Sequence, residues 1–176
     1  MMVDLREKVV QDRGIIAKIQ SMIPGFSGYR ANEDIRAADS MLRIQLADRL
    51  AAVRKDLEAC RATLADDMNL ESLDRVGTLI SRFKAIEGEV RHAEQGYSGI
   101  SAKIRVGEAE LNRLYEYDLN LTMSLAEISG ETAKVRVLAG TGGQDFKAGL
   151  ASLGAELDKF QADFRKRMTI VTGTEA

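Results

Sequence analysis

A glutamate and a histidine three residues apart supply ligands to the di-iron and di-manganese centres of helical bundles, and this chain has one such pair, Glu89 and His92. Such a centre needs two Glu-x-x-His motifs and two further glutamates. His92 is the only histidine in the sequence, so one chain cannot supply the second motif. We interpret His92 as a surface residue in the last turn of a helix, where a cation suits the helix dipole.

Two other patterns resemble catalytic or phosphate-binding features. A nucleophilic cysteine needs a neighbouring base and a lowered pKa. Cys60, the only cysteine, lies instead at apolar spacing between Leu57 and Leu64, which indicates a core position. The glycines at 140, 142 and 143 are not followed by Gly-Lys-Ser/Thr, and no strand is predicted before them, so they indicate a hairpin. We expect a protein that is not an enzyme, with no catalytic residue, no metal and no cofactor.

One acidic residue interrupts an apolar helical seam. Counting in sevens from Ile104 gives Leu111, Asp118, Leu125 and Thr132. Asp118 therefore falls where a core residue belongs, and a buried carboxylate must pair with a cation or accept hydrogen bonds. The alternative is that Asp118 reaches solvent at the edge of the bundle.

Several residues are candidate partners for this carboxylate. Tyr115 and Tyr117 can supply hydroxyl groups, and Arg30 and Arg36 are candidate counter-ions from another part of the chain. We hypothesise that Asp118 determines helix register or partner choice, so that Asp118→Leu should change pairing or oligomeric state. The predicted register or partner contacts are Asp118, Tyr115, Tyr117, Tyr29 and Arg30.

A basic cluster, Arg165-Lys166-Arg167, lies near the predicted end of the last helix. Its apolar neighbours include Phe160 and Phe164, so the cluster could touch an anionic membrane surface. Three cations are fewer than the usual polybasic cluster, and cations are ordinarily favoured at a helix C-terminus. We favour the helix-end interpretation.

Composition limits the class of protein. The chain has 176 residues, of which 45% are apolar and 30% charged, with a formal charge of −2. No stretch approaches the ~20 apolar residues of a membrane-spanning helix. The balanced charge offers no basic field for nucleic acid. A single cysteine and an N-terminus without a signal-peptide pattern predict a soluble, cytoplasmic protein.

Helix-forming residues dominate the sequence, which contains only one proline, Pro24. Apolar residues recur at alternating steps of four and three, as at Leu46, Leu50, Val53, Leu57, Cys60 and Leu64, and again at Phe146, Leu150, Leu153, Leu157, Phe160, Phe164 and Met168. Turn-forming segments predict a first helix over about 3–22 and a second, capped by Asn32, to about 67. A third helix, capped by Asn69, runs to about 95, a fourth follows the turn 96–99 and runs to about 138, and a fifth follows the turn 139–143 and ends near 169.

These helices predict an all-α fold: an elongated, antiparallel helical bundle of coiled-coil hairpins with about five helices. We expect one helical domain over 1–176, in which 1–95 forms a first helix plus a hairpin and 96–176 a second hairpin. The fourth helix should extend roughly 50 to 55 Å, with breaks at Gly107 or Gly130 as alternatives.

A short motif occurs twice, as Gly25-Phe26-Ser27-Gly28 and Gly96-Tyr97-Ser98-Gly99. We interpret each copy as a sharp turn whose aromatic ring packs over a bundle end. Together with Ile23-Pro24, Ala38-Asp39 and Leu114-Tyr115-Glu116-Tyr117-Asp118, the motif resembles an uncharacterised family of prokaryotic all-helical proteins. That resemblance implies an all-helical fold and no known activity.

A long heptad seam in only two hairpins leaves apolar edges that a second copy can cover. We therefore expect a scaffold or adaptor that acts through protein contacts with itself and with an unknown protein partner. The alternative is a peripheral membrane protein of helical-hairpin type that acts in stress or remodelling. A first helix containing Ile15, Ile16 and Ile19 is amphipathic enough to lie on a membrane, although we expect it to cover a hairpin.

Overall fold

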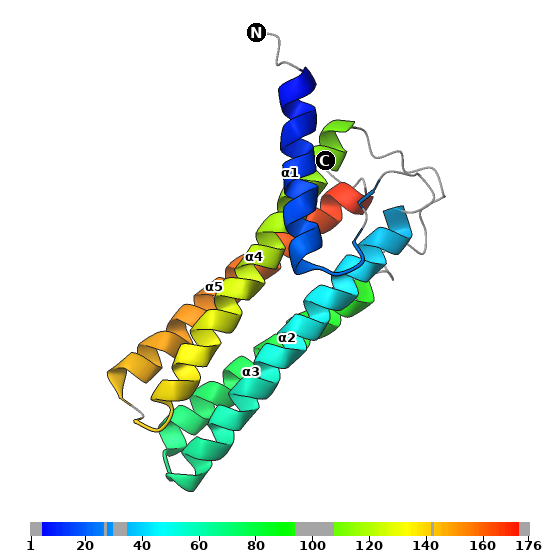
Figure 1. Cartoon of the computed structure of the whole chain (residues 1–176). Coiled ribbons are helices and arrows are strands. Elements are labelled where there is room, and N and C mark those ends of the chain that lie inside the picture. Colours follow the sequence, from blue (N-terminus) through cyan, green and yellow to red (C-terminus); the bar gives the residue numbers. More distant parts are fainter. Residues whose placement is uncertain (1–4, 27, 30–34, 94–107, 142, 173–176) are drawn as a thin grey trace.

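A computed structural model of the chain describes residues 5–26, 28–29, 35–93, 108–141 and 143–172. Five helices form in these ranges, and the described residues contain no strand. The predicted all-α bundle is therefore confirmed (Figure 1). The helices are α1 (Leu5–Met22), α2 (Ile35–Asp66), α3 (Leu70–His92), α4 (Glu108–Leu138) and α5 (Gln144–Thr172).

Helices α2 and α3 form one antiparallel hairpin, and α4 and α5 form another. The first hairpin is held on its surface by Arg54 Nε, 3.1 Å from Glu87 Oε2, and by Arg91 Nη2, 2.7 Å from Asp48 Oδ1. As the residue number rises on α2 it falls on α3, which is the signature of an antiparallel pair.

The two hairpins lie side by side and point the same way. Lys147 Nζ lies 3.1 Å from Glu71 Oε1 and Arg165 Nε lies 2.7 Å from Glu89 Oε1, each pair being separated by 76 residues. This constant offset makes α5 parallel to α3. Both hairpin loops consequently lie at one end of the bundle, the hairpin end, while α2 and α4 begin and α3 and α5 end at the opposite, open end (Figure 1).

The predicted seams form the core. Leu46, Leu50 and Leu57 on α2 are fully buried, as are Leu153, Leu157 and Phe160 on α5. Each such side chain contributes roughly 1.5–3 kcal/mol relative to exposure, so these rows supply much of the driving force for folding.

Helix ends follow the predicted breakers with two differences. Asn69 caps α3 as expected, since its Oδ1 accepts a hydrogen bond from Ser72 N at 3.2 Å. Helix α4 is described only from Glu108 and continues through Gly130 without a break, so its 31 residues at about 1.5 Å each span about 46 Å. Helix α5 continues to Thr172, three residues beyond the predicted end.

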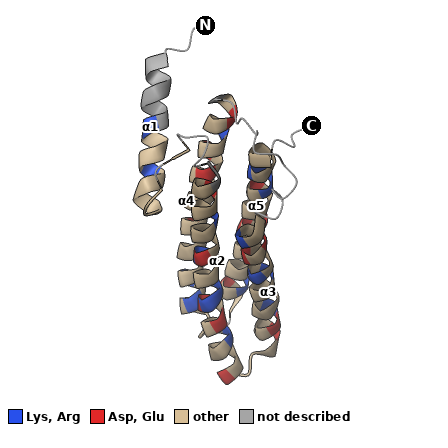
Figure 2. Cartoon of the chain, turned by 90° about the vertical axis from the view of Figure 1, so that its right-hand side faces the viewer, with Lys and Arg blue, Asp and Glu red and all other residues tan. Residues whose placement is uncertain are grey.

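Helix α1 stands outside the four-helix core, beside α4 (Figures 1 and 2). Ile19 in its last turn and Ile23 directly after it are fully buried. The following turn is held to α2, where Arg49 donates to the Met22 carbonyl and Gln45 Nε2 donates to the Pro24 carbonyl at 2.9 Å. The first helix thus covers the second hairpin while its end is attached to the first.

Candidate functional site

A layer of charged and phenolic side chains is buried in the core at the open end. Arg167 lies at its centre and is fully buried. Its Nε donates to Asp118 Oδ1 at 2.5 Å, its Nη1 to Asp39 Oδ1 at 2.6 Å, and its Nη2 to the Tyr29 hydroxyl at 3.1 Å. One guanidinium on α5 therefore joins α2, α4 and the turn after α1.

A second arginine extends the layer to the remaining helix. Arg43 Nε donates to Asp39 Oδ2 at 2.9 Å, and its Nη1 donates to the carbonyls of Val90 and Arg91 at 3.2 and 3.3 Å. Those carbonyls belong to the last turn of α3, where helical C=O groups have no partner within their own helix. The layer thus contacts all four core helices, and its two carboxylates balance its two guanidiniums.

The turn after α1 enters the same layer through Tyr29. Its hydroxyl donates to Asp118 Oδ2, and its backbone N–H donates to the Tyr115 hydroxyl at 2.8 Å. The Tyr29 ring lies 5.1 Å from the Tyr115 ring and meets the Phe26 ring edge-on at 5.4 Å. This arrangement agrees with the predicted packing of the first Gly-aromatic-Ser-Gly turn over a bundle end, whereas the second copy lies outside the described residues.

Glycine is required at position 28 for two reasons. Its φ of +88° is a conformation that L side chains rarely adopt, and a Cβ there would lie 2.8 Å from the Tyr115 hydroxyl. The tight approach lets the Tyr29 amide reach Tyr115.

Burial and charge act against each other in this layer. Burial raises the pKa of Asp118, while the Arg167 guanidinium opposes that rise. Burial also opposes ionisation of Asp39, but Arg167 and Arg43 outweigh it and hold the pKa of Asp39 below its usual value. Burial disfavours the charge of Arg167, yet Asp118 and Asp39 keep its pKa well above the usual value. Burial, followed by the Asp118 charge, raises the pKa of Tyr29, so the phenol is neutral and donates.

The predicted contact residues have different outcomes. Asp118, Tyr115 and Tyr29 come together in the layer, while Tyr117 is half-buried and packs against the apolar core. Arg30 lies outside the described residues, as does the side chain of Arg36. The alternative in which Asp118 reaches solvent is wrong, because its exposure is 0%.

The interpretation of the basic cluster needs correction at one residue. Arg165 is exposed and pairs with Glu89, but Arg167 is fully buried and serves as the counter-ion of Asp118. The cluster therefore presents only two cations at the surface, Arg165 and Lys166. The reason is the period of α5, which turns Arg167 inward.

Three residues of the layer were missed from the sequence, namely Asp39, Arg43 and Arg167. Steps of three and four backward from Leu46 reach Arg43 and Asp39, and a step of three forward from Phe164 reaches Arg167. The seam continued through these positions although their side chains are charged. The heptad period therefore marks these positions as inward-facing, whereas the apolar pattern alone indicates Met168, which is only partly buried.

The two other candidate residues, Cys60 and His92, lie at the core and surface positions that the sequence predicts. Cys60 is buried in the core, and burial raises the pKa of its thiol, which disfavours the nucleophilic thiolate. His92 is exposed in the last turn of α3. Within the described ranges, no group of three or more His, Cys, Asp or Glu side chains is placed to hold a metal ion.

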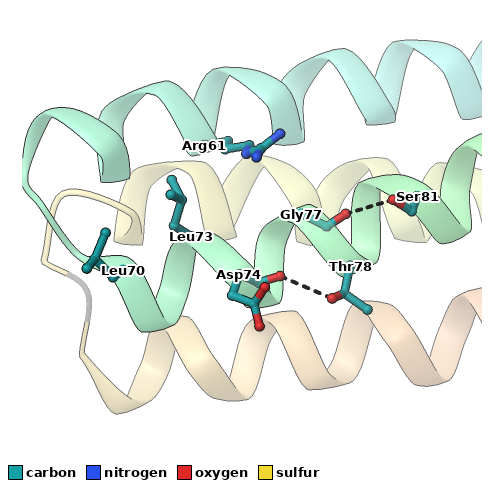
Figure 3. Close-up of a pocket in the computed structure, with 7 residues that line it drawn as sticks. All are labelled: Arg61, Leu70, Leu73, Asp74, Gly77, Thr78 and Ser81. Carbon is teal, nitrogen blue, oxygen red and sulfur yellow. Dashed lines mark hydrogen bonds between the residues drawn. The ribbon is translucent and has the colours of Figure 1, made fainter.

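A groove of about 510 Å³ lies between α2 and α3 near the hairpin end (Figure 3). Two of its hydroxyl groups bond their own helix, Ser81 Oγ to the Gly77 carbonyl and Thr78 Oγ1 to the Asp74 carbonyl, both at 3.1 Å. Those hydroxyls are therefore engaged in local backbone contacts within α3.

The fold and this layer define an all-α helical bundle with a buried ionic layer. The chain matches no protein-family model, and neither the curated proteins nor the solved structures give a match. This outcome is consistent with the resemblance to an uncharacterised helical family.

Proposed function

We propose that this protein is a non-catalytic scaffold or adaptor that acts through protein contacts and associates with itself. The observation that carries the proposal is the placement of two kinds of side chain: some charged groups pair inside the bundle, while six large apolar side chains of the described residues are exposed. Within the part of the chain that the structure describes, these side chains are Met41, Ile44, Met68, Leu70, Met123 and Val137. Exposed apolar surface of this kind marks interaction sites when it is contiguous.

The ionic layer supports a structural role. Asp118, Asp39 and Arg167 are each fully buried and bond one another or Tyr29. A substrate would have to break these contacts and enter the core to use them. The layer thus suits the hypothesis that Asp118 governs helix register, since a buried polar group is matched in only one alignment of the helices.

The alternative, a peripheral membrane protein, loses support from the burial of Arg167. At the hairpin end, the exposed Met68 and Leu70 are accompanied by Asp66, Asp67 and Glu71, whose charge disfavours an anionic lipid surface. No helix of the described residues is long and apolar enough to cross a membrane. The cytoplasmic location stays a prediction.

The test is the mass of the protein in solution, measured by light scattering after size-exclusion chromatography, with and without anionic liposomes. A discrete oligomer that ignores lipid is the expected result. A monomer at tens of micromolar would contradict self-association. Co-elution with liposomes would favour the membrane alternative.

A further inference from the structure

Helix α4 is apolar on two opposite sides. Its inner side contributes Leu121, Leu125 and Ile128 to the core. Its outward side carries a second row at alternating steps of four and three, which we name the outer α4 face: Leu119, Met123, Ala126, Gly130, Ala133 and Val137. Met123 is 47% exposed and Val137 81% exposed, and the small residues between them are also exposed. A solvent-facing helix side normally carries charged residues, so this row indicates contact with another helix.

One end of this row already binds a helix of the same chain. Helix α1 packs against α4 (Figure 1). Between the two helices lies a groove lined by Lys18, Ser21, Met22, Leu119, Met123, Ala126 and Glu127. The groove has a volume of about 390 Å³. Beyond it the row continues uncovered to Val137. The chain thus provides an apolar groove at one end of the row and a protruding apolar side chain at the other.

Side-chain size along the outer α4 face is symmetric about Gly130. Large residues, Met123 and Val137, stand seven positions before and after it, and alanines 126 and 133 stand four before and three after. No atom outside the local backbone lies within 4 Å of a Cβ built at Gly130, so the chain's own packing does not require glycine there. A glycine flanked by alanines permits close approach of a second helix backbone.

A two-fold axis through Gly130 would place two antiparallel α4 helices in self-complementary contact. Val137 of each copy would then lie opposite Met123 of the other, at the apolar groove between α1 and α4. Opposite charges would also meet on one flank of this contact. Glu127 lies three residues before Gly130 and would face Lys134 of the other copy, which lies four residues after Gly130. In an isologous interface every such contact occurs twice.

We propose that the outer α4 face is an antiparallel dimer interface between two copies of this chain, crossing at Gly130 and seating Val137 in the partner's α1–α4 groove. This inference rests on the proposed self-association and specifies its surface. A partner protein of different sequence is the competing occupant, and the oligomeric state of the purified chain distinguishes the two.

The first experiment compares Val137→Asp with Leu70→Asp in the full chain by sedimentation equilibrium. Both side chains are exposed apolar groups at the hairpin end, 81% and 74% respectively, but only Val137 lies on the outer α4 face. Because the aspartate would be buried at the partner's groove, we expect Val137→Asp to weaken dimerisation roughly 30-fold or more. Leu70→Asp should leave the dimer unchanged, and circular dichroism should show both variants folded.

The outcomes distinguish the two proposals. A monomeric wild-type protein would overturn both self-association and this interface. A wild-type oligomer unaffected by Val137→Asp would overturn the interface alone. Equal loss of the dimer in both variants would also overturn it, since apolar surface in general would then drive assembly.

Cross-linking tests the geometry without relying on a disruptive charge. In a Cys60→Ala background, Gly130→Cys should form an intermolecular disulfide readily, because the two-fold axis brings the two positions together. Gly14, an exposed glycine inside α1, provides the matched control, and Gly14→Cys should stay uncross-linked. Equal cross-linking of the two variants would overturn the proposed crossing point.

Discussion

The open end and the hairpin end of the bundle are built from different chemistry. At the open end the seams are occupied by Asp39, Arg43, Asp118 and Arg167, all with 0% exposure. At the hairpin end the buried positions of the described residues carry no charged residue: most are apolar, such as Leu64, Val76 and Phe146, and the polar ones, Ser72 and Thr132, are uncharged. Apolar contacts are nondirectional, so a helix displaced by a heptad could still bury them, whereas the ionic layer is matched in one alignment only. The comparison suggests that the hairpin end contributes stability and the open end specificity.

The largest effect should come from removing the centre of the ionic layer. Arg167→Met leaves Asp39 and Asp118 as buried carboxylates without their shared cation, and breaking a buried pair costs about 3–5 kcal/mol. The free energy of unfolding, measured by urea titration, is the readout. Leu157→Met in the apolar core provides a matched control and should cost less than about 1.5 kcal/mol. Similar losses in the two variants would remove the distinction between the ends.

The next effect depends on pH. Because the pKa of Asp39 is lowered in the folded protein, its ionised form contributes stability above its unfolded pKa of about 3.9 and loses it as the pH falls through the folded value. Asp39→Asn should therefore cost about 2–3 kcal/mol near neutral pH, and this cost should fall progressively once the pH drops below about 3.9, becoming small only below the folded pKa. Urea titrations of both proteins across this range are the measurement. A cost independent of pH would show that the charge of Asp39 is not what stabilises the layer.

A smaller effect is expected from one hydroxyl group. Tyr29→Phe removes both the donor to Asp118 Oδ2 and the acceptor for Arg167 Nη2 but keeps the ring contacts with Phe26 and Tyr115, so the cost should be about 1.5 kcal/mol. Hydrogen exchange should accelerate in α1, which the Tyr29 turn connects to the layer. Tyr117→Phe, at a half-buried position in the apolar packing, should change stability by less than about 0.5 kcal/mol. Equal losses of stability in Tyr29→Phe and Tyr117→Phe would show that the hydroxyl of Tyr29 does not stabilise the ionic layer.

The smallest expected change in stability is at the hairpin end, and it is a stabilisation rather than a loss. Met68 adopts a φ of +55° in the α2–α3 turn with 84% of its surface exposed. Met68→Gly should stabilise the protein by about 0.5–1 kcal/mol, since glycine adopts this conformation without the Cβ penalty. The thermal midpoint is a sufficient readout, with Met123→Gly in the α4 interior as a destabilising control. A loss of stability at position 68 would indicate that the methionine makes a contact that outweighs its backbone strain.

The heptad positions, counted without regard to residue type, predict more of the buried ionic layer than the apolar residues do. Asp118 was found because it interrupts a row, and the same counting reaches Asp39, Arg43 and Arg167. The period does not determine which buried charges pair across helices. Each helix can rotate about its axis and shift along it until it packs against the others. Among the described residues the cation that pairs with Asp118 is Arg167, 49 residues further along the chain, whereas the candidate counter-ions Arg30 and Arg36 have side chains outside the described residues.

The sequence by itself determined the helices, the turns that separate them and the rows that face inward, because propensity, capping and periodicity act over a few neighbouring residues. Asn69 capping α3 and the burial of Cys60 are examples. Only the tertiary structure decided that the two hairpins lie parallel, that α1 rests on α4, and that one arginine joins Asp39 to Asp118. The physical reason is that heptad rows are chemically alike, so the choice among their pairings depends on long-range contacts that no local pattern encodes.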